Sequence, residues 1–366
     1  MDNIIESFNK VLADGMQIKA SDIHLCVGSS WKFRIHGNIT PLDMKPLDMN
    51  ECKAIVRHIL LDSPSINEEN IDNVIHELQD HDCSYMLPGI ARFRVNICRQ
   101  RGSFSIVLRV VPFSIPTIDA LGLPEVIKDI SLEERGLVLV TGITGSGKST
   151  TLASMINVIN HKKPCKIVTI EDPIEFLHNE VKSSIIQREV GLDTESFSLA
   201  LRGALRQDPD IILVGEMRDT VTIEIALKAA ETGHLVLSTV HTTDASKTIH
   251  RIISAFDLSE QQAVRVRLAD ALKAVISQRL LSRKDETGRV AVLEIMRNTL
   301  TIKDCIENPE KTDSITDYMK SGRDQYGMQT FDQHLMDLYN QGVIDLEKAK
   351  AAATSPSDFE RNVVFS

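Results

Sequence analysis

The sequence has few aromatic residues, no excess of positive charge and no closely paired cysteines. Phe, Trp and Tyr make up 4% of the 366 residues, with a single Trp, and the formal net charge at pH 7 is −10. An acidic chain without a stripe of basic and aromatic residues is a poor candidate for nucleic-acid binding. The hydrophobic content of 42% and the charged content of 25% are those of an ordinary globular protein.

Cysteine spacing and hydrophobic runs argue against two further kinds of site. None of the six cysteines forms a C-x-x-C motif, so no tetracysteine zinc site is predicted, and reduced thiols in a cytosolic protein are expected. No apolar run approaches the roughly 18 residues of a membrane span, and residues 1–10 do not have the pattern of a signal peptide. Any role at a membrane is therefore expected to depend on a partner.

Chain length and patterning predict an N-terminal domain, a linker, a second domain and a C-terminal annex. Residues 1–111 have the pattern of a mixed α/β domain, in which 90–98 and 103–111 form a hairpin. Pro112, Pro116 and Pro124 indicate a linker over residues 112–124. The other elements expected in the first domain are helices at 4–15, 50–61 and 70–78 and strands at 21–26 and 31–36.

Residues 125–294 alternate between apolar strand-like runs and helical segments. This alternation predicts a parallel sheet covered by helices, as in a RecA-like nucleotide-binding core. Residues 295–366 are expected to be mainly helical. The expected parallel strands are 137–141, 166–171, 211–215 and 235–240, and the clearest C-terminal helices are 330–341 and 345–353.

The segment Gly142–Ser149 fits the phosphate-binding pattern G-x-x-x-x-G-K-[ST] at every fixed position. Its glycines permit a tight loop whose N–H groups face a phosphate, and the following helix adds partial positive charge. Lys148 would reach the β- and γ-phosphates, and the Ser149 hydroxyl would ligate Mg²⁺. The residues expected to contact the nucleotide here are Thr144, Gly145, Ser146, Gly147, Lys148, Ser149 and Thr150.

Acidic side chains follow two of the expected strands. Glu216 comes after the run 211–214, while Glu171, Asp172 and Glu175 lie at or just beyond the end of the strand at 166–171. Mg²⁺ prefers oxygen ligands, and hydrolysis needs a group that orients or deprotonates water. Glu216 is interpreted as the ligand of Mg²⁺ or of its bound water. Taken alone, without the neighbouring motifs, each of these acids would be interpreted as a solvated loop carboxylate.

Three segments downstream of the phosphate loop resemble motifs of the secretion ATPases. Residues 170–176 resemble the Asp box, 206–219 the Walker B segment and 232–242 the His box. Their order and spacing resemble the PilT-type branch, the type IV pilus retraction ATPases. The resemblance runs over nearly the whole chain and is densest from 136 to 280. The missing tetracysteine subdomain and the short N-terminal region favour this branch over pilus-assembly and type II secretion relatives.

The resemblance implies a fold and a set of cofactors. The fold would be a PAS-like N-terminal α/β domain, a RecA-like P-loop NTPase core and C-terminal helices, assembled as a ring hexamer that uses ATP and Mg²⁺. Glu175 would be the base that activates water, with Glu171 and Asp172 as alternatives. Gly215 precedes Glu216 where ordinary Walker B strands carry Asp, as in this family.

Two histidines flank the expected strand 235–240. His234 and His241 would lie beside the phosphates, and His241 would donate to the γ-phosphate or relay its loss. A histidine in apolar surroundings is, however, more often a core residue than a functional one.

Arginines would supply the remaining positive charge at the nucleotide. Arg94 and Arg109 lie on the expected N-terminal hairpin, and arginines at such positions in the family approach the nucleotide. Arg202 and Arg206 are similarly expected near phosphates. These last two are four residues apart, so one helix face is expected to carry both. Surface salt bridges are the alternative role for each. Arg92, Arg99 and Arg101 are further neighbours on or near the hairpin.

The resemblance also implies mechanical work. Hydrolysis around the ring would turn an inner-membrane platform protein (PilC-like) and so return pilin from the fibre to the membrane, with the ATPase cytoplasmic and peripheral. Residues 326–332 match the family well, but Thr301–Asn308 reads Thr-Ile-Lys-Asp-Cys-Ile-Glu-Asn where typical members read Ala-Ile-Arg-Asn-Leu-Ile-Arg-Glu. This departure leaves open a PilU-like accessory motor or a regulatory nucleotide-binding paralogue. A pilus-assembly or type II secretion ATPase and a nucleic-acid motor are less favoured alternatives.

Overall fold

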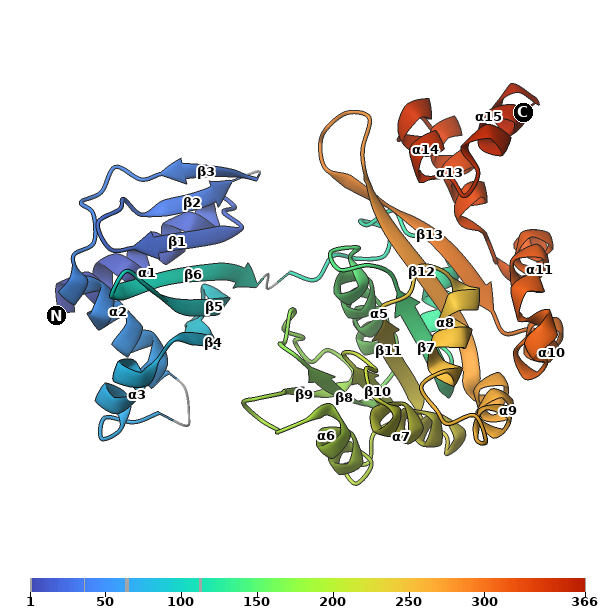
Figure 1. The fold of residues 1–366 in the computed structure, drawn as a ribbon, viewed down its shortest axis with the longest axis horizontal. Coiled ribbons are helices and arrows are strands. Elements are labelled where there is room, and N and C mark those ends of the chain that lie inside the picture. Colours follow the sequence, from blue (N-terminus) through green and yellow to red (C-terminus); the bar gives the residue numbers. More distant parts are fainter. Residues whose placement is uncertain (1, 36, 63–65, 112–113, 366) are drawn as a thin grey trace. The chain divides into compact units, whose positions relative to one another are not determined.

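The chain divides into two compact units in a computed structural model that describes residues 2–35, 37–62, 66–111 and 114–365 (Figure 1). The first unit comprises residues 1–114 together with Glu175–Leu177, and the second comprises residues 115–174 and 178–366. Residues 112 and 113 of the expected linker lie outside the described residues. Residues 115–124 belong to the second unit.

The first unit contains a six-stranded antiparallel sheet in the order β3-β2-β1-β6-β5-β4. Along β5, buried Phe93 and Val95 alternate with less buried Arg92 and exposed Arg94, so one sheet face joins the core with the helices. The expected hairpin is confirmed, and β3 and β4 are additional strands. The elements are α1 (Asp2–Gln17), β1 (Asp22–Cys26), β2 (Lys32–Ile35), β3 (Asn38–Pro41), α2 (Met49–Leu61), α3 (Ile71–Glu77), β4 (Asp80–Leu87), β5 (Ala91–Gln100) and β6 (Ser103–Val111).

The second unit contains a seven-stranded sheet in the order β13-β12-β7-β11-β10-β8-β9. All neighbours are parallel except β12 and β13, which form a long antiparallel ribbon at one edge. The four expected parallel strands are confirmed as β7 (Gly136–Thr141), β8 (Lys166–Glu171), β10 (Ile211–Val214) and β11 (Leu235–Val240). The strands that sequence patterning missed are β9 (Ser184–Glu189), β12 (Leu272–Ser282) and β13 (Arg289–Arg297).

Helices cover both faces of this sheet. On one face α4 (Val126–Ser131) and α5 (Lys148–Lys162) enclose one apolar core, and the helices on the other face enclose a second. This is the three-layer arrangement of α/β proteins. The second layer contains α6 (Phe197–Ala204), α7 (Thr220–Glu231), α8 (Ala245–Ile253), α9 (Gln261–Ala271), α10 (Leu300–Glu307) and α11 (Ile315–Ser321).

The C-terminal region is mainly helical, as expected, although β13 extends to Arg297. The predicted helices at 330–341 and 345–353 are confirmed, and with β12 and β13 they enclose a small separate core. No helix among the described residues is long and apolar enough to cross a membrane. The region contains a 3₁₀ helix (Pro309–Ser314), α12 (Arg323–Tyr326), α13 (Phe331–Asn340), α14 (Leu346–Ala352) and α15 (Pro356–Phe365).

The parallel pairing sets the position of every sequence motif. β7, β8, β10 and β11 run in the same direction, so their carboxyl ends meet at one edge of the sheet (Figure 1). Ligands of open α/β sheets bind at this edge. The phosphate loop, the first acidic segment, Glu216 and His241 all follow strands that end there.

His334 joins α13 to the sheet and makes the stability of the second unit depend on pH. Its Nδ1 accepts a hydrogen bond from the Leu293 N–H at 2.9 Å, and burial lowers the pKa of the ring to about 4. The folded state therefore holds the ring neutral, whereas the unfolded state protonates it near pH 6.5. This contribution to stability is complete above pH 6.5, decreases progressively as the pH falls below 6.5, and is fully lost once the pH has fallen through about 4.

We expect His334 to account for a loss of about 2 kcal/mol of unfolding free energy between pH 7 and pH 5. Denaturant unfolding followed by circular dichroism at the two pH values measures it. In His334→Asn the amide oxygen can still accept from Leu293 but does not titrate, so the pH dependence should shrink by that amount. An unchanged pH dependence in the variant would contradict the assignment.

Candidate active site

The loop between β7 and α5 is shaped by its glycines and by the neighbouring strand β12. Gly142 and Gly147 have φ of 146° and 90°, values that side chains disfavour. A Cβ atom on Gly142 would also clash with the backbone oxygen of Gln278, and one on Gly147 would lie 2.7 Å from the Gln278 amide nitrogen. Glycine is therefore required at both positions by backbone conformation and by the close approach of β12.

The loop presents several donors to an anion. Gly147 is the N-cap of α5 and provides no side-chain cap, so the first N–H groups of the helix are left for another acceptor. Lys148 is buried and donates from Nζ to the carbonyls of Gly142 at 3.0 Å and Ile143 at 3.1 Å. The buried Ser146 hydroxyl has no hydrogen-bond partner among the described residues. These groups fit a phosphate, which would accept from all of them.

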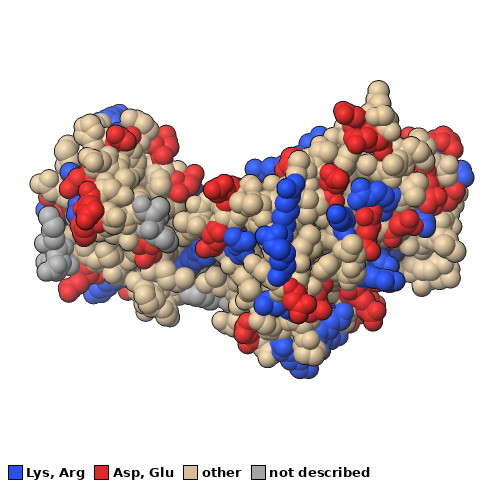
Figure 2. Space-filling view, turned by 90° about the horizontal axis from the view of Figure 1, so that it is seen from below, with Lys and Arg blue, Asp and Glu red and all other residues tan. Residues whose placement is uncertain are grey.

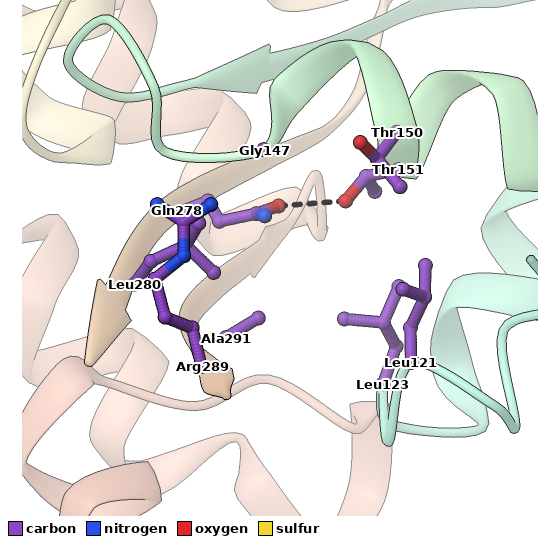
Figure 3. Close-up of a pocket in the computed structure, with 9 residues that line it drawn as sticks. All are labelled: Leu121, Leu123, Gly147, Thr150, Thr151, Gln278, Leu280, Arg289 and Ala291. Atoms are coloured by element: carbon purple, nitrogen blue, oxygen red, sulfur yellow. Dashed lines mark hydrogen bonds between the residues drawn. The ribbon is translucent and has the colours of Figure 1, made fainter. Parts of the chain in front are cut away.

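Gln278 on β12 holds the loop in place, although the sequence analysis did not identify it. Its side chain is buried, donates from Nε2 to the Ser146 carbonyl at 2.7 Å and accepts at Oε1 from the Thr151 hydroxyl at 2.7 Å (Figure 3). One amide thus ties the loop to the first turn of α5. The local sequence does not mark Gln278, because it lies between Ser277 and Arg279 in a strand of mixed polarity.

A cavity of 290 Å³ opens beside the first turn of α5 (Figure 3). Its walls are largely aliphatic, with polar groups at the end nearest the phosphate loop, the usual composition of a small-molecule site. Of the residues predicted to bind nucleotide, Gly147 and Thr150 line it, whereas Thr144 and Gly145 are exposed in the loop. The lining residues are Leu121, Leu123, Gly147, Thr150, Thr151, Gln278, Leu280, Arg289 and Ala291.

Glu216 and His241 meet at the carboxyl edge of the sheet. Glu216 follows β10, His241 follows the adjacent β11, and His241 Nε2 lies 3.3 Å from Glu216 Oε1. The other carboxylate oxygen of Glu216 accepts from Arg218 Nε at 2.7 Å. The structure therefore brings together two of the predicted site residues from separate motifs, with a cation beside them.

The three acids after β8 differ in their surroundings. Glu171 accepts hydrogen bonds from the Thr169 hydroxyl at 2.7 Å and from Gln187 at 3.3 Å, so it helps to fix the end of the strand. Asp172 and Glu175 are exposed on the loop that follows. Glu175 is therefore more accessible to an attacking water than Glu171.

His234 lies at the other edge of the sheet. It precedes β11, its backbone carbonyl accepts from Gly136 N at the start of β7, and its Nδ1 lies 2.9 Å from the Ala229 carbonyl. The length of β11 separates it from His241 by roughly 20 Å. The expectation that both histidines lie beside the phosphates is thus wrong for His234 within one chain. A residue before a strand and a residue after it lie at opposite ends of that strand, and only His241 is at the carboxyl end.

The expectation that Arg202 and Arg206 share one helix face is also wrong. Helix α6 ends at Ala204, so Arg202 is in its last turn and Arg206 is in the turn beyond it. The helix stops because Asp208 precedes Pro209, and a residue before proline avoids the helical region. Both side chains are exposed, and α6 leads toward the amino end of β10, away from the phosphate loop of the same chain.

Arg94 and Arg109 face each other on β5 and β6 of the first unit, as expected for a hairpin. Both side chains are exposed. Arg109 donates from Nε to Asp22 Oδ1 at 2.9 Å. Burial alone would raise the pKa of Asp22, but hydrogen bonds from Ser21 and Arg109 hold it below its usual value. Asp22 is thus a fixed counter-charge for one of the two arginines.

The fold and the loop define a P-loop nucleotide-binding protein with a RecA-like core. The glycine loop leaves the carboxyl end of a central parallel strand and leads directly into a helix that begins with Lys148 and Ser149. Carboxylate and imidazole groups lie at the same sheet edge. Among the described residues, no group of three or more His, Cys, Asp or Glu side chains is placed to hold a metal by itself.

The chain belongs to the family of type II/IV secretion system proteins, which it matches over residues 1–351. It is 44% identical to the type IV pilus retraction ATPase PilT of Pseudomonas aeruginosa, with 96% of this chain and 99% of that protein covered. It is 39% identical to the type IV pilus ATPase PilU of the same organism, with coverages of 96% and 90%. The crystal structure of the pilus retraction motor PilT with bound ADP matches it with a TM-score of 0.87 and 42% identity, with coverages of 96% and 98%.

Replacing Gln278 by Leu is expected to weaken nucleotide binding about tenfold, because two buried hydrogen-bonding groups lose their partner. Titration with a fluorescent ADP analogue measures the affinity. Gln329→Leu is the matched control, since Gln329 is also buried and donates to a backbone carbonyl, that of Leu293 at 3.0 Å, outside the nucleotide site. Equal affinities for the two variants would show that Gln278 does not support the loop.

Replacing Glu175 by Gln is expected to lower kcat for ATP hydrolysis by about 100-fold or more while nucleotide binding is kept. Glu171→Gln should lower it less than tenfold, since the amide oxygen can still accept from Thr169. Steady-state ATPase assays and nucleotide titration separate the two effects. A large loss with Glu171→Gln and none with Glu175→Gln would reassign the base.

Proposed function

We propose that this chain is an ATP-hydrolysing motor that powers type IV pilus retraction as a ring hexamer. The observation that carries the proposal is the complete phosphate cradle, with Glu216 and His241 at the same sheet edge. The similarity to PilT supports it, because it extends over 96% of this chain and nearly the whole of that protein. Coupling to retraction would go through an inner-membrane platform protein, with this chain peripheral on the cytoplasmic side.

ATP is the proposed substrate and Mg²⁺ its cofactor. The cradle would hold the phosphates and the adjoining aliphatic cavity the nucleoside, with Lys148 moving from the loop carbonyls to the β- and γ-phosphates. Ser149 and Glu216 would hold Mg²⁺ together with phosphate oxygens and water, which suits an ion that keeps several waters. Bound Mg²⁺ supplies neutralisation of phosphate charge. Glu175 would take the proton of the attacking water, and His241 would contact the γ-phosphate.

The positions of the arginines support a nucleotide site that is completed by a second subunit. Arg94 and Arg109 are exposed on the first unit, and Arg202 and Arg206 are exposed where α6 leads into the amino end of β10. Phosphoryl transfer commonly needs arginine near the γ-phosphate. A closed ring places one subunit's surface against the next subunit's site. We infer that these arginines serve the nucleotide of a neighbouring subunit.

Nucleic acid is not a proposed partner. The chain carries a net charge of −10. On the face shown in Figure 2, Lys and Arg side chains are interspersed with Asp and Glu. Binding to a polyanion needs a cluster of unpaired basic groups.

An accessory motor is the second candidate, and the surface of α10 favours it. Where retraction ATPases carry two arginines four residues apart, this chain has Lys303 and Glu307. Lys303 pairs with Asp270 and lies 3.9 Å from Glu307. The helix surface is thus partly neutralised within the chain. Similarity to PilU over 96% of the chain is compatible with this reading.

Gene deletion and complementation in the host test the proposal. Cells without the gene should carry excess surface pili and show no surface motility. Wild-type protein should restore the normal number of pili and the motility, and Lys148→Ala should restore neither. Counts of surface pili by electron microscopy and a motility assay are the measurements. Loss of pili on deletion would indicate an assembly motor. Unchanged pili and motility would favour the accessory role.

A further inference from the structure

A row of three polar residues crosses β7, β12 and β13 at one side of the second sheet. Thr141 on β7 pairs with Ser277 on β12, and Ser277 pairs with Glu294 on β13. Residues paired in this way lie side by side and point to the same sheet face. Thr141 is the last residue before the phosphate loop. The row therefore extends from the nucleotide site to the β12–β13 ribbon.

All three residues are buried, and two of them are joined by a hydrogen bond. Thr141 and Ser277 are fully buried, and the Thr141 hydroxyl donates to the Ser277 oxygen at 3.0 Å. Glu294 is 6% exposed and lies beside Ser277 in the β12–β13 pairing. A buried carboxyl in an apolar sheet needs hydrogen-bond partners for its oxygens. The row is thus a polar element inside the core.

Glu294 extends this element to helix α8. Its Oε1 accepts a hydrogen bond from the backbone N–H of Ala245, the first residue of α8, at 2.8 Å. Ala245 comes four residues after His241, and the intervening Asp244 is the N-cap of the same helix. Fixing Ala245 to β13 therefore fixes the carboxyl end of the short segment that carries His241. The other end of that segment is fixed by β11.

We propose that Glu294 is a positioning residue that ties the start of α8 to the β12–β13 ribbon and so holds His241 against Glu216 for hydrolysis. The inference rests on the proposed ATPase function for its kinetic consequence. The structural consequence, an anchored α8 start, does not depend on that function.

The hydrogen bond rather than the charge of Glu294 is the important property. Burial raises the pKa of the Glu294 carboxyl to about 7, with Asp244 on α8 raising it further and Arg279 on β12 opposing the shift. Near neutral pH the group is thus divided between its neutral and ionised forms. Glutamine keeps an acceptor oxygen at the same reach and resembles the neutral form. Aspartate keeps the charge but is one methylene shorter, so it does not reach Ala245.

The test compares Glu294→Gln, Glu294→Asp and Glu294→Leu in the full-length protein. We expect Gln to retain kcat within about threefold and Asp and Leu to lower kcat at least tenfold, while all three bind a fluorescent ADP analogue within threefold of wild type. Gln329→Leu again serves as the control for loss of a buried hydrogen bond beside β13, with kcat unchanged. Wild-type kcat in a folded Glu294→Asp protein, or equal losses in Gln and Asp, would overturn the proposal.

Hydrogen–deuterium exchange provides a readout that needs no hydrolysis. Peptides covering residues 241–253 should exchange faster in Glu294→Asp than in wild type and Glu294→Gln, while peptides of α13 should not change. Unchanged exchange at 241–253 would overturn the anchoring itself. If exchange is faster in Glu294→Asp but the wild-type protein does not hydrolyse ATP, the anchoring of α8 is supported and the proposed function is rejected.

Discussion

The close contact between β12 and the phosphate loop is the constraint on which the rest of the site depends. A glycine-rich loop is costly to order because glycine loses more backbone freedom than other residues. Here Gln278 restrains the loop from its side, with hydrogen bonds of 2.7 Å to the Ser146 carbonyl and the Thr151 hydroxyl. The same contact leaves no room for a Cβ on Gly142 or Gly147. The conformation of the loop is thus restrained by contacts within the chain.

Some charged groups of the site are paired within one chain, whereas others are exposed on its surface. Within one chain, Lys148 is turned onto loop carbonyls and Glu216 is paired with Arg218. The remaining arginines of interest are exposed, either on the first unit or at the opposite edge of the second sheet. Exposed ion pairs contribute little to folding stability, so these arginines are not placed there to stabilise the fold. An intersubunit role at the phosphates is consistent with this division.

The sequence predicted the parallel strands well because each is a short apolar run bounded by turn residues, as 137–141 and 235–240 show. It predicted the phosphate loop because that loop is a local pattern with local geometry. It did not predict β12 and β13, whose mixture of Gln278, Arg279 and Glu294 with aliphatic residues is not the pattern of a buried strand. β12 also pairs with β7, which is far from it in the chain. Gln278 and Glu294 became recognisable only when the register placed them beside the loop and α8.

The region that departs from the retraction ATPases is linked to α8 by hydrogen bonds. Ser246 in the first turn of α8 donates to the Thr312 carbonyl at 3.3 Å. The buried guanidinium of Arg265 donates to Ile306 O at 3.0 Å and to the Thr312 hydroxyl at 3.2 Å, which joins α9, α10 and the 3₁₀ helix. Any displacement of α8 would therefore act on α10 through Thr312. The buried side of α10 keeps Ile302 and Ile306 but has Cys305 where the family reads Leu, and the half-buried Lys303 and Glu307 stand where it reads Arg. The departure therefore affects both the packed side of the helix and its charged side.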